Sequence, residues 1–364
     1  MKRNYAKLQP ARGATEERQN MNKQPTLALL VQKQWRPRVV ATIAIVTVLL
    51  MARWVFGGEP NGNQGHAARP HSAPFSRIVV FGDSLSDTGN FYHLTGGLEP
   101  PPPYAGGRFS NGPLWIEYLA AALGMQLNQE DNYAVAGATT GHANSNDGLA
   151  GLEFPGLQDQ LAEFLQSHQA GGADPDALYV VWAGANDFFV TLAGGGSPVD
   201  LISHGVANTG FAVQQLRSAG AQQILVLNVP DLGLTPYGLA SGMGPEITRL
   251  AATYNQVLET TLQALADAGI PTIRVDAFAT LQAMVDFPVE FGFTNVTEPF
   301  LLVGGDPAEF VFWDAVHPTT RGHQVLADEA LDQLIKFYSP RQGNSFPPAL
   351  VNSLKDLVNA HRHH

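Results

Sequence analysis

A chain of 364 residues with 45% hydrophobic and 15% charged residues has the size and composition of a globular protein of one large or two modest domains. Its net charge of −11 is unevenly spread: residues 1–56 hold ten Lys/Arg against two Glu, and the remainder holds 11 basic and 30 acidic residues. The acidic body excludes a nucleic-acid partner, which needs clustered Lys/Arg, and the lack of cysteine excludes thiol nucleophiles and thiolate zinc sites.

An apolar stretch near the N-terminus has the layout of an export signal. Residues 1–38 form a basic segment, residues 39–52 carry no charge, and the apolar character resumes after Arg53 up to residue 56. A basic flank before an apolar core of about 7–15 residues is typical of a secretory signal, and residues 39–56 together are marginally long enough to anchor in a bilayer. The positive-inside rule then places the acidic body outside the cytoplasm, as a periplasmic, secreted or membrane-anchored protein. A cleaved signal, a retained anchor that associates with the membrane and a buried helix of the soluble fold all stay open.

Strand and helix patterns alternate after a flexible linker at residues 57–75. Alternating βαβ units with continuous apolar strands imply a parallel sheet that is covered on both faces. We therefore expect one doubly wound α/β domain over residues 76–340, with about five parallel strands. Short apolar runs predict the strands at residues 78–81, 133–135, 177–183, 224–229 and 272–275. Apolar residues at helical spacing predict helices over residues 156–168, 207–219, 247–268 and 324–338.

The C-terminal tail, residues 341–364, contains a weak helix pattern and three histidines at its end. His361, His363 and His364 are typical of a metal-binding tract, but a solvated chain end is the simpler interpretation. We expect no metal site there.

The first predicted strand leads into a polar turn that can hold a nucleophile. Residues 81–90 have the sequence FGDSLSDTGN, so Ser84 follows the strand directly. In open α/β sheets, ligands bind outside the carboxyl ends of the strands, which is where Ser84 is expected to lie. The alternative is that Asp83, Ser84 and Ser86 cap a helix, because these residue types dominate N-caps.

Two later segments can supply hydrogen-bond donors to a developing oxyanion. Residues 132–138, NYAVAGA, end in small residues that let a backbone N–H approach a substrate closely. Residues 182–187, WAGAND, place a carboxamide and a carboxylate at the end of a predicted strand. The alternatives are a glycine turn in the first segment and an Asx turn in the second.

A loop near the C-terminus combines a carboxylate with a histidine. Pro318 biases His317 away from helical conformation, so His317 is expected on a loop before the last helix. Asp314 can accept a hydrogen bond from one ring nitrogen, which fixes the tautomer and leaves the other nitrogen to act as a base. The alternative makes Asp314 a helix cap and His317 an ordinary loop histidine. Together with Ser84 at a strand end, the pair favours nucleophilic catalysis.

Taken together, these segments resemble the sequence blocks of the GDSL family of lipases and esterases, also called SGNH hydrolases. FGDSLSDTGN is similar to the nucleophile block, NYAVAGATT to the glycine block, GAND to the asparagine block and FWDAVHPT to the Asp–His block. Residues 100–115 also resemble the lipase-like branch that includes lecithinase- and haemolysin-type enzymes. The resemblance spans roughly residues 77–335 and implies a flavodoxin-like three-layer α/β/α sandwich. The G-x-S-x-G elbow of α/β-hydrolases is absent, because Ser86 stands at its second glycine position.

The resemblance implies a role for each of the residues singled out above. Ser84 would be the nucleophile, His317 its base and Asp314 the group that orients His317. The backbone N–H groups of Ser84 and Gly137 and the side chain of Asn186 would form the oxyanion hole. Supporting roles fall to Asp83, Asp87, Asn90 and Asp187.

The implied activity is hydrolysis of lipid or other carboxylic esters through an acyl-enzyme, without a metal or a cofactor. Ala136 departs from the family pattern, which usually has a second glycine there, and this change affects the shape of the substrate site more than the assigned donor Gly137. The alternatives are an acyltransferase, a polysaccharide acetylesterase and a catalytically dead binding protein. The oligomeric state stays open.

Overall fold

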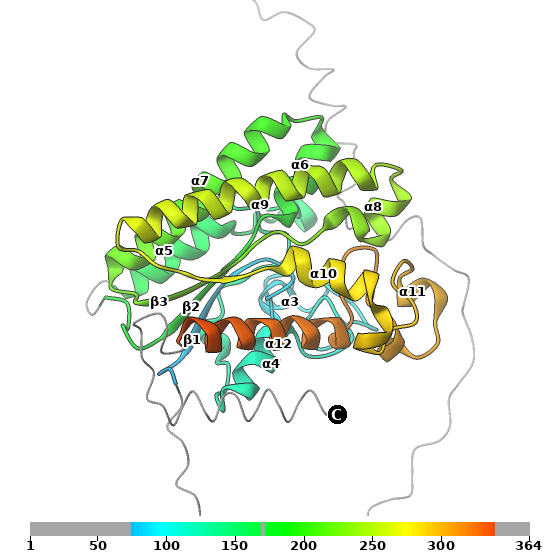
Figure 1. The fold of residues 1–364 in the computed structure, drawn as a ribbon, viewed down its shortest axis with the longest axis horizontal. Coiled ribbons are helices and arrows are strands. Elements are labelled where there is room, and N and C mark those ends of the chain that lie inside the picture. Colours follow the sequence, from blue (N-terminus) through cyan, green and yellow to red (C-terminus); the bar gives the residue numbers. More distant parts are fainter. Residues whose placement is uncertain (1–73, 169–171, 339–364) are drawn as a thin grey trace, which may run out of the picture.

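The computed structural model describes residues 74–168 and 172–338 (Figure 1). The basic segment at residues 1–38, the signal or anchor predicted at residues 39–56 and the tail at residues 341–364 lie outside the described residues, as does nearly all of the linker. Within the described ranges, no helix is both long enough and apolar enough to cross a membrane.

Four parallel strands form one sheet in the order β1-β2-β3-β4. The register pairs Val80 with Val180 and Val180 with Leu225, so the carboxyl ends of the strands lie at one edge of the sheet. Nearly every strand residue is buried, which is why the strand sequences are continuous apolar runs. The strands are β1 (Ile78–Gly82), β2 (Leu178–Trp182), β3 (Gln223–Leu227) and β4 (Ile273–Val275).

The prediction of a strand at residues 133–135 is wrong, and the sheet has four strands instead of about five. The segment still follows the free edge of β1, where its N–H groups donate to the carbonyls of Val80 and Gly82 at 2.8 and 3.1 Å. Its other edge is bonded to side chains: Asn90 Nδ2 donates to two of its carbonyls, and Asn132 Oδ1 accepts a neighbouring backbone N–H. These side-chain bonds replace a regular ladder. With this segment placed beside β1, the strand order is that of the predicted flavodoxin-like fold.

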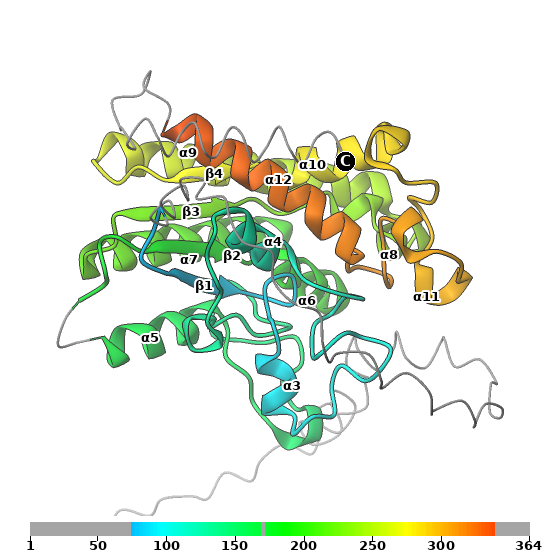
Figure 2. The same cartoon turned by 90° about the horizontal axis from the view of Figure 1, so that it is seen from below.

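Helices cover both faces of the sheet and give the predicted three-layer α/β/α sandwich (Figures 1 and 2). Successive strand residues pack against opposite helix layers: Val79 belongs to the core on one face of the sheet and Val80 to the core on the other. The helices of one face are α5 (Leu157–Ser167), α7 (Pro198–Ala219) and α9 (Gly244–Asp267). Those of the other face are α4 (Trp115–Ala122) and α12 (Thr320–Phe337).

Several shorter helices were not predicted. They are α3 (Asn90–Leu94), α6 (Ala185–Gly194), α8 (Pro236–Ala240), α10 (Ala277–Asp286) and α11 (Phe300–Val303). The 3₁₀ turns are η1 (Gln129–Asp131), η2 (Leu149–Gly151), η3 (Leu232–Leu234), η4 (Pro288–Phe291) and η5 (Pro307–Glu309). Helix α7 also begins earlier than residue 207, because Ser197 accepts the Asp200 N–H and Pro198 occupies the first turn.

Candidate active site

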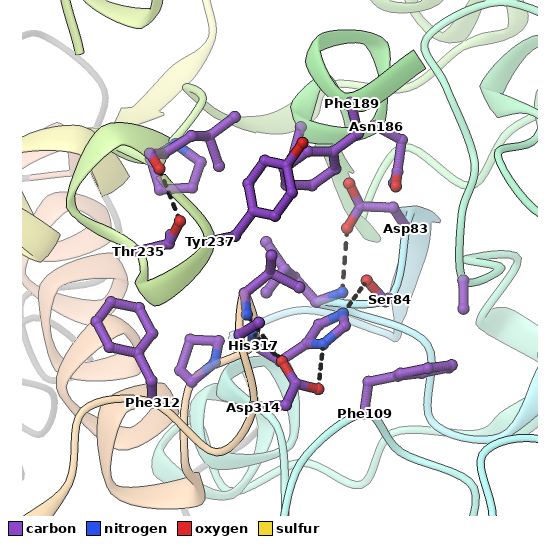
Figure 3. A pocket seen from close by; sticks show the side chains of 18 of the residues that line it. Asp83, Ser84, Phe109, Asn186, Phe189, Thr235, Tyr237, Phe312, Asp314 and His317 are labelled. Carbon is purple, nitrogen blue, oxygen red and sulfur yellow. Dashed lines mark hydrogen bonds and ion pairs between the residues drawn. The ribbon is translucent and has the colours of Figure 1, made fainter. Parts of the chain in front are cut away.

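Ser84, His317 and Asp314 form a continuous chain of hydrogen bonds (Figure 3). His317 Nε2 lies 2.8 Å from Ser84 Oγ, and His317 Nδ1 lies 2.7 Å from Asp314 Oδ2. Ser84 stands in the turn after β1, and the other two stand on the loop before α12. The side chains of His317 and Asp314 are 14% and 8% exposed, so the acid–base pair is shielded from solvent. A hydroxyl, a base and an orienting carboxylate in this order can perform nucleophilic catalysis.

Four hydrogen bonds fix the Asp314 carboxylate. Oδ1 accepts the N–H groups of Val316 and His317 at 2.9 and 2.7 Å, and Oδ2 accepts the Tyr104 hydroxyl at 2.7 Å as well as His317 Nδ1. Burial by itself would raise the pKa of Asp314, but the charge of His317 and the hydrogen bonds from His317 and Val316 lower this pKa below its ordinary value. Asp314 is therefore held ionised. It does not cap α12, whose N-cap is Thr319.

The three predicted oxyanion donors all line one pocket. Gly137 has a φ of +85°, and a Cβ at this position would come within 2.3 Å of neighbouring asparagine side chains, so only glycine fits. Asn186 Nδ2 donates to the Ala138 carbonyl at 3.1 Å, which leaves its second N–H for a ligand. Among the described residues, no protein acceptor is paired with the backbone N–H of Ser84 or Gly137. These groups can therefore bind a ligand oxygen.

Asp87 links the turn after β1 to α3 and to residues 132–140, which we call the glycine segment. Its carboxylate accepts hydrogen bonds of 2.6 to 3.0 Å from three successive N–H groups at the start of α3 and from Ala136, which directly precedes Gly137. Burial raises the pKa of Asp87 against the opposing effect of these bonds. Asp87, and not Asp83 or Ser84, therefore satisfies the start of this helix.

Asp187 and Asn90 hold the same glycine segment at other points. Asp187 accepts the backbone N–H and the hydroxyl of Thr140 at 2.9 and 2.6 Å, and burial raises the pKa of Asp187. Asn90 binds carbonyls that precede Ala136 along the chain. Gly137 is thus braced on both sides along the sequence.

Asp83 is a buried carboxyl next to Ser84 that lines the pocket. Its Oδ1 accepts the Leu85 N–H at 3.0 Å. Burial raises the pKa of Asp83 to about 7, against the opposing effects of the Leu85 hydrogen bond and the charge of His317. A large fraction of Asp83 is therefore uncharged near neutral pH, which lowers the negative charge beside Ser84.

Three further residues that support the site were missed by the sequence reasoning. The Tyr104 hydroxyl donates to Asp314, the Phe109 ring lies 5.0 Å from the His317 ring between centroids, and Ser145 Oγ donates to Asn186 Oδ1 at 3.3 Å. Burial and the Asp314 charge raise the pKa of Tyr104, so its hydroxyl remains a donor. Tyr104 and Phe109 lie within the segment that resembles the lipase-like branch, so a signal for them was present. No pattern singled out Ser145.

The pocket at Ser84 is mostly apolar and has a volume of about 190 Å³. It extends from the carboxyl ends of β1 and β2 to α10 and α12 (Figure 3). Such a site can hold an ester with its carbonyl at Ser84 and an apolar chain directed away from it. In the part of the chain that the structure describes, no group of His, Asp and Glu side chains could hold a metal ion. The apolar wall includes Phe109, Phe189, Leu232, Leu281, Met284, Phe312 and Val316.

Comparison with known proteins shows the family to which this chain is similar. The profile of a family described as GDSL-like Lipase/Acylhydrolase matches residues 78–330. A phosphatidylcholine-sterol acyltransferase of Aeromonas hydrophila is 28% identical over 70% of this chain and 89% of its own length. A thermolabile hemolysin of Vibrio parahaemolyticus is 28% identical over 71% of this chain, which spans 63% of that relative. The crystal structure of an acetylxylan esterase from Geobacillus stearothermophilus has 15% identity and a TM-score of 0.41, covering 72% of this chain and 95% of that one.

Proposed function

Because the chain belongs to the GDSL-like lipase/acylhydrolase family and is therefore an ester-bond hydrolase, we propose that it cleaves carboxylic esters of lipids through an acyl-enzyme on Ser84. One observation carries the residue roles. Ser84 Oγ lies 2.8 Å from His317 Nε2, while Asp314 Oδ2 is hydrogen-bonded to the other ring nitrogen of His317, Nδ1.

The reaction begins when His317 Nε2 takes the hydroxyl proton of Ser84 and Oγ bonds to the ester carbonyl carbon. The resulting oxyanion accepts hydrogen bonds from the backbone N–H groups of Ser84 and Gly137 and from the Asn186 side chain. Collapse breaks the bond to the alcohol oxygen, which receives the proton from His317. Water, deprotonated by His317, then attacks the acyl group, and collapse of the second intermediate returns Ser84 to its hydroxyl form.

Apolar side chains form most of the pocket surface, which supports lipid esters over acetyl esters of polysaccharides, because apolar contacts stabilise an acyl chain and a sugar chain depends mainly on polar partners. The test is a series of soluble esters of increasing acyl length with a phospholipid included, measured as kcat/KM. We expect kcat/KM to rise from acetyl to longer acyl groups. A maximum at the acetyl ester would favour the acetylesterase alternative, and no turnover of any ester would favour a binding protein.

Acyl transfer is the second candidate, and two observations favour it. The site is shielded, because the His317 side chain is only 14% exposed. A relative that matches this chain over 89% of the relative's own length is named as an acyltransferase. An acyl-enzyme passes its acyl group to an alcohol when water is excluded. The test is the ratio of new ester to free acid when a sterol or a simple alcohol is added to the phospholipid assay. Transfer is supported if the new ester dominates.

We also propose that the catalytic domain acts outside the cytoplasm. The proposal rests on the basic residues before position 39 and on the apolar run at residues 39–56, ahead of an acidic body. Fractionation of the native host, with N-terminal sequencing of the recovered protein, tests it. Recovery of the protein in the soluble cytoplasmic fraction would contradict it.

A further inference from the structure

Large apolar side chains stand exposed at the end of the molecule that contains the pocket. On α11, Leu301, Leu302 and Val303 are 40%, 49% and 49% exposed, and Leu239 of α8 and the nearby Met243 are 43% and 47% exposed. Figures 1 and 2 place α8 and α11 at the same end of the molecule as α10, which lines the pocket. We call these five residues the apolar rim.

The apolar rim is attached directly to the loop that holds Asp314. Helix α11 donates two backbone hydrogen bonds, of 2.9 and 3.0 Å, to the carbonyls of Phe312 and Trp313, and α8 donates one of 2.8 Å to the Ala315 carbonyl. Asp314 lies between these acceptors, and Phe312 and Ala315 line the pocket. The rim therefore flanks the site and is not an unrelated surface patch.

The segments that follow the four strands at their carboxyl ends contain three histidines but no Lys or Arg. No Lys or Arg occurs in residues 83–107, 183–216, 228–248 or 275–320, which together include all the chain that directly follows the four strands at their carboxyl ends. The sequence around α11 instead contains the acidic residues Glu298, Asp306 and Glu309. Anionic lipid surfaces attract basic segments and repel acidic ones. This face of the protein is therefore unsuited to an anionic membrane.

We propose that the apolar rim docks the enzyme on a lipid surface with uncharged or zwitterionic head groups, so that the pocket faces the lipid. The inference rests on the proposed function, because it supplies that site with its substrate from an aggregate. Half-exposed Leu, Val and Met side chains enter the boundary between head groups and acyl chains, where their transfer from water is favourable. Without Lys or Arg in these segments, this apolar contact is the main source of binding.

The test is vesicle sedimentation with the full-length Ser84→Ala protein, which cannot consume the lipid through the proposed nucleophile. With phosphatidylcholine vesicles, we expect the added Leu301→Ser/Leu302→Ser change to lower the partition coefficient about fivefold or more. Phe211→Ser, a half-exposed apolar residue on α7, is the matched control and should leave the partition coefficient unchanged. Leu239→Ser on α8 is a second variant, and thermal melting verifies that each protein is folded.

Three results would overturn the proposal. The first is equal binding by the Leu301→Ser/Leu302→Ser protein and its parent, as expected if residues 39–56 bind the vesicles instead. The second is binding that strengthens when phosphatidylglycerol replaces part of the phosphatidylcholine. The third is a dimer that the double change dissociates without affecting vesicle binding, which would assign the rim to a second copy of the chain.

Failure of the docking surface can be separated from failure of the proposed function. Hydrolysis of a soluble short-chain ester by the unmodified protein reports on the function alone. If that activity is present and the vesicle result is negative, only the docking surface is wrong. If the soluble ester is untouched while the rim controls vesicle binding, only the proposed function is wrong.

Discussion

At the scale of single residues, one oxygen of Asp314 serves two partners. Oδ2 accepts both the His317 Nδ1 hydrogen and the Tyr104 hydroxyl, each at 2.7 Å. The tyrosine donor spreads part of the carboxylate charge that would otherwise act on the imidazole. Tyr104 is therefore a positioning residue that tunes the base without touching the reacting atoms.

We expect Tyr104→Phe to lower kcat/KM about tenfold, since a hydrogen bond to a charged group contributes about 1.5 kcal/mol or more. Tyr179→Phe, which removes a hydroxyl bonded to the Asp174 carbonyl at the other end of β2, is the control. A Tyr104→Phe enzyme with an unchanged kcat/KM would contradict the role.

Asp83 makes a second residue-scale prediction, which concerns stability. In the folded protein the pKa of Asp83, about 7, lies above its ordinary value of 3.8, so folding favours the protonated carboxyl. Its contribution to stability is fully present below about pH 4 and is lost as the pH rises through 7. Asp83→Asn removes this loss, and its stability relative to the parent should increase between pH 5 and pH 8 by about 2.5 kcal/mol. Asp87 titrates in both proteins and cancels in the difference, whereas the charge of Asp187 is one of the causes that raise the pKa of Asp83 and is part of the effect. Urea unfolding at the two pH values measures it, and a pH-independent difference would refute it.

The positions of single residues were predictable where the local sequence decides the conformation. Pro318 keeps His317 out of the helix, and the apolar run before Ser84 predicts a strand end. Both residues lie where these patterns indicate. The contact of Tyr104 with Asp314 could not be predicted in this way, because 210 positions separate the two residues and only the folded chain brings them together.

At the scale of elements, Asp87 couples the start of α3 to the glycine segment. Asp87→Ala leaves four N–H groups, three of them buried, without an acceptor, and we expect it to lower the free energy of unfolding by roughly 3 kcal/mol or more. Because Ala136 is then released, Gly137 moves and kcat should fall more than KM rises. Asp200→Ala, at an exposed position of α7, is the control for loss of a carboxylate. Unfolding curves and steady-state kinetics measure both effects, and an Asp87→Ala protein with normal kcat would exclude the coupling.

Elements were predictable in proportion to their length and regularity. The long helices α5, α9 and α12 follow from apolar periodicity, because each buries one face against the sheet. The short helices around the pocket have little periodicity, and contacts distant in sequence determine them, as with the hydrogen bonds from α11 to the loop of Asp314. Residues 133–135 have the composition of a strand, but side chains of Asn90 and Asn132 occupy its backbone groups.

At the scale of the whole molecule, the strand order explains where the site lies. Chain order reverses beside β1, between β2 on one side and the segment at residues 133–135 on the other, and ligands bind at such a point in open α/β sheets. The parallel sheet and its covering layers were predictable, because buried parallel strands give continuous apolar runs. The depth of the pocket toward α10 was not, because it depends on how α10 and α12 pack together.

The pocket makes a prediction about substrate length. Met284 of α10 is buried in the pocket wall, and Met284→Trp should fill the part of the pocket next to α10. We expect kcat/KM for long-chain esters to fall about tenfold or more, and much less for short-chain esters, because overpacking by one large side chain costs roughly 1–3 kcal/mol. Val257→Trp on the outer side of α9 is the control. Equal losses at all chain lengths would mean that the acyl chain lies elsewhere.

The most direct test of the central claim is the mass of the intact protein after treatment with a fluorophosphonate. The account predicts one adduct on the parent protein, located at Ser84 by peptide mapping, and none on Ser84→Ala. His317→Ala should react far more slowly, because the proton of Ser84 then has no acceptor at 2.8 Å. A parent protein that gains no adduct, or a Ser84→Ala protein that hydrolyses esters at the parent rate, would contradict the assignment of Ser84 as the nucleophile.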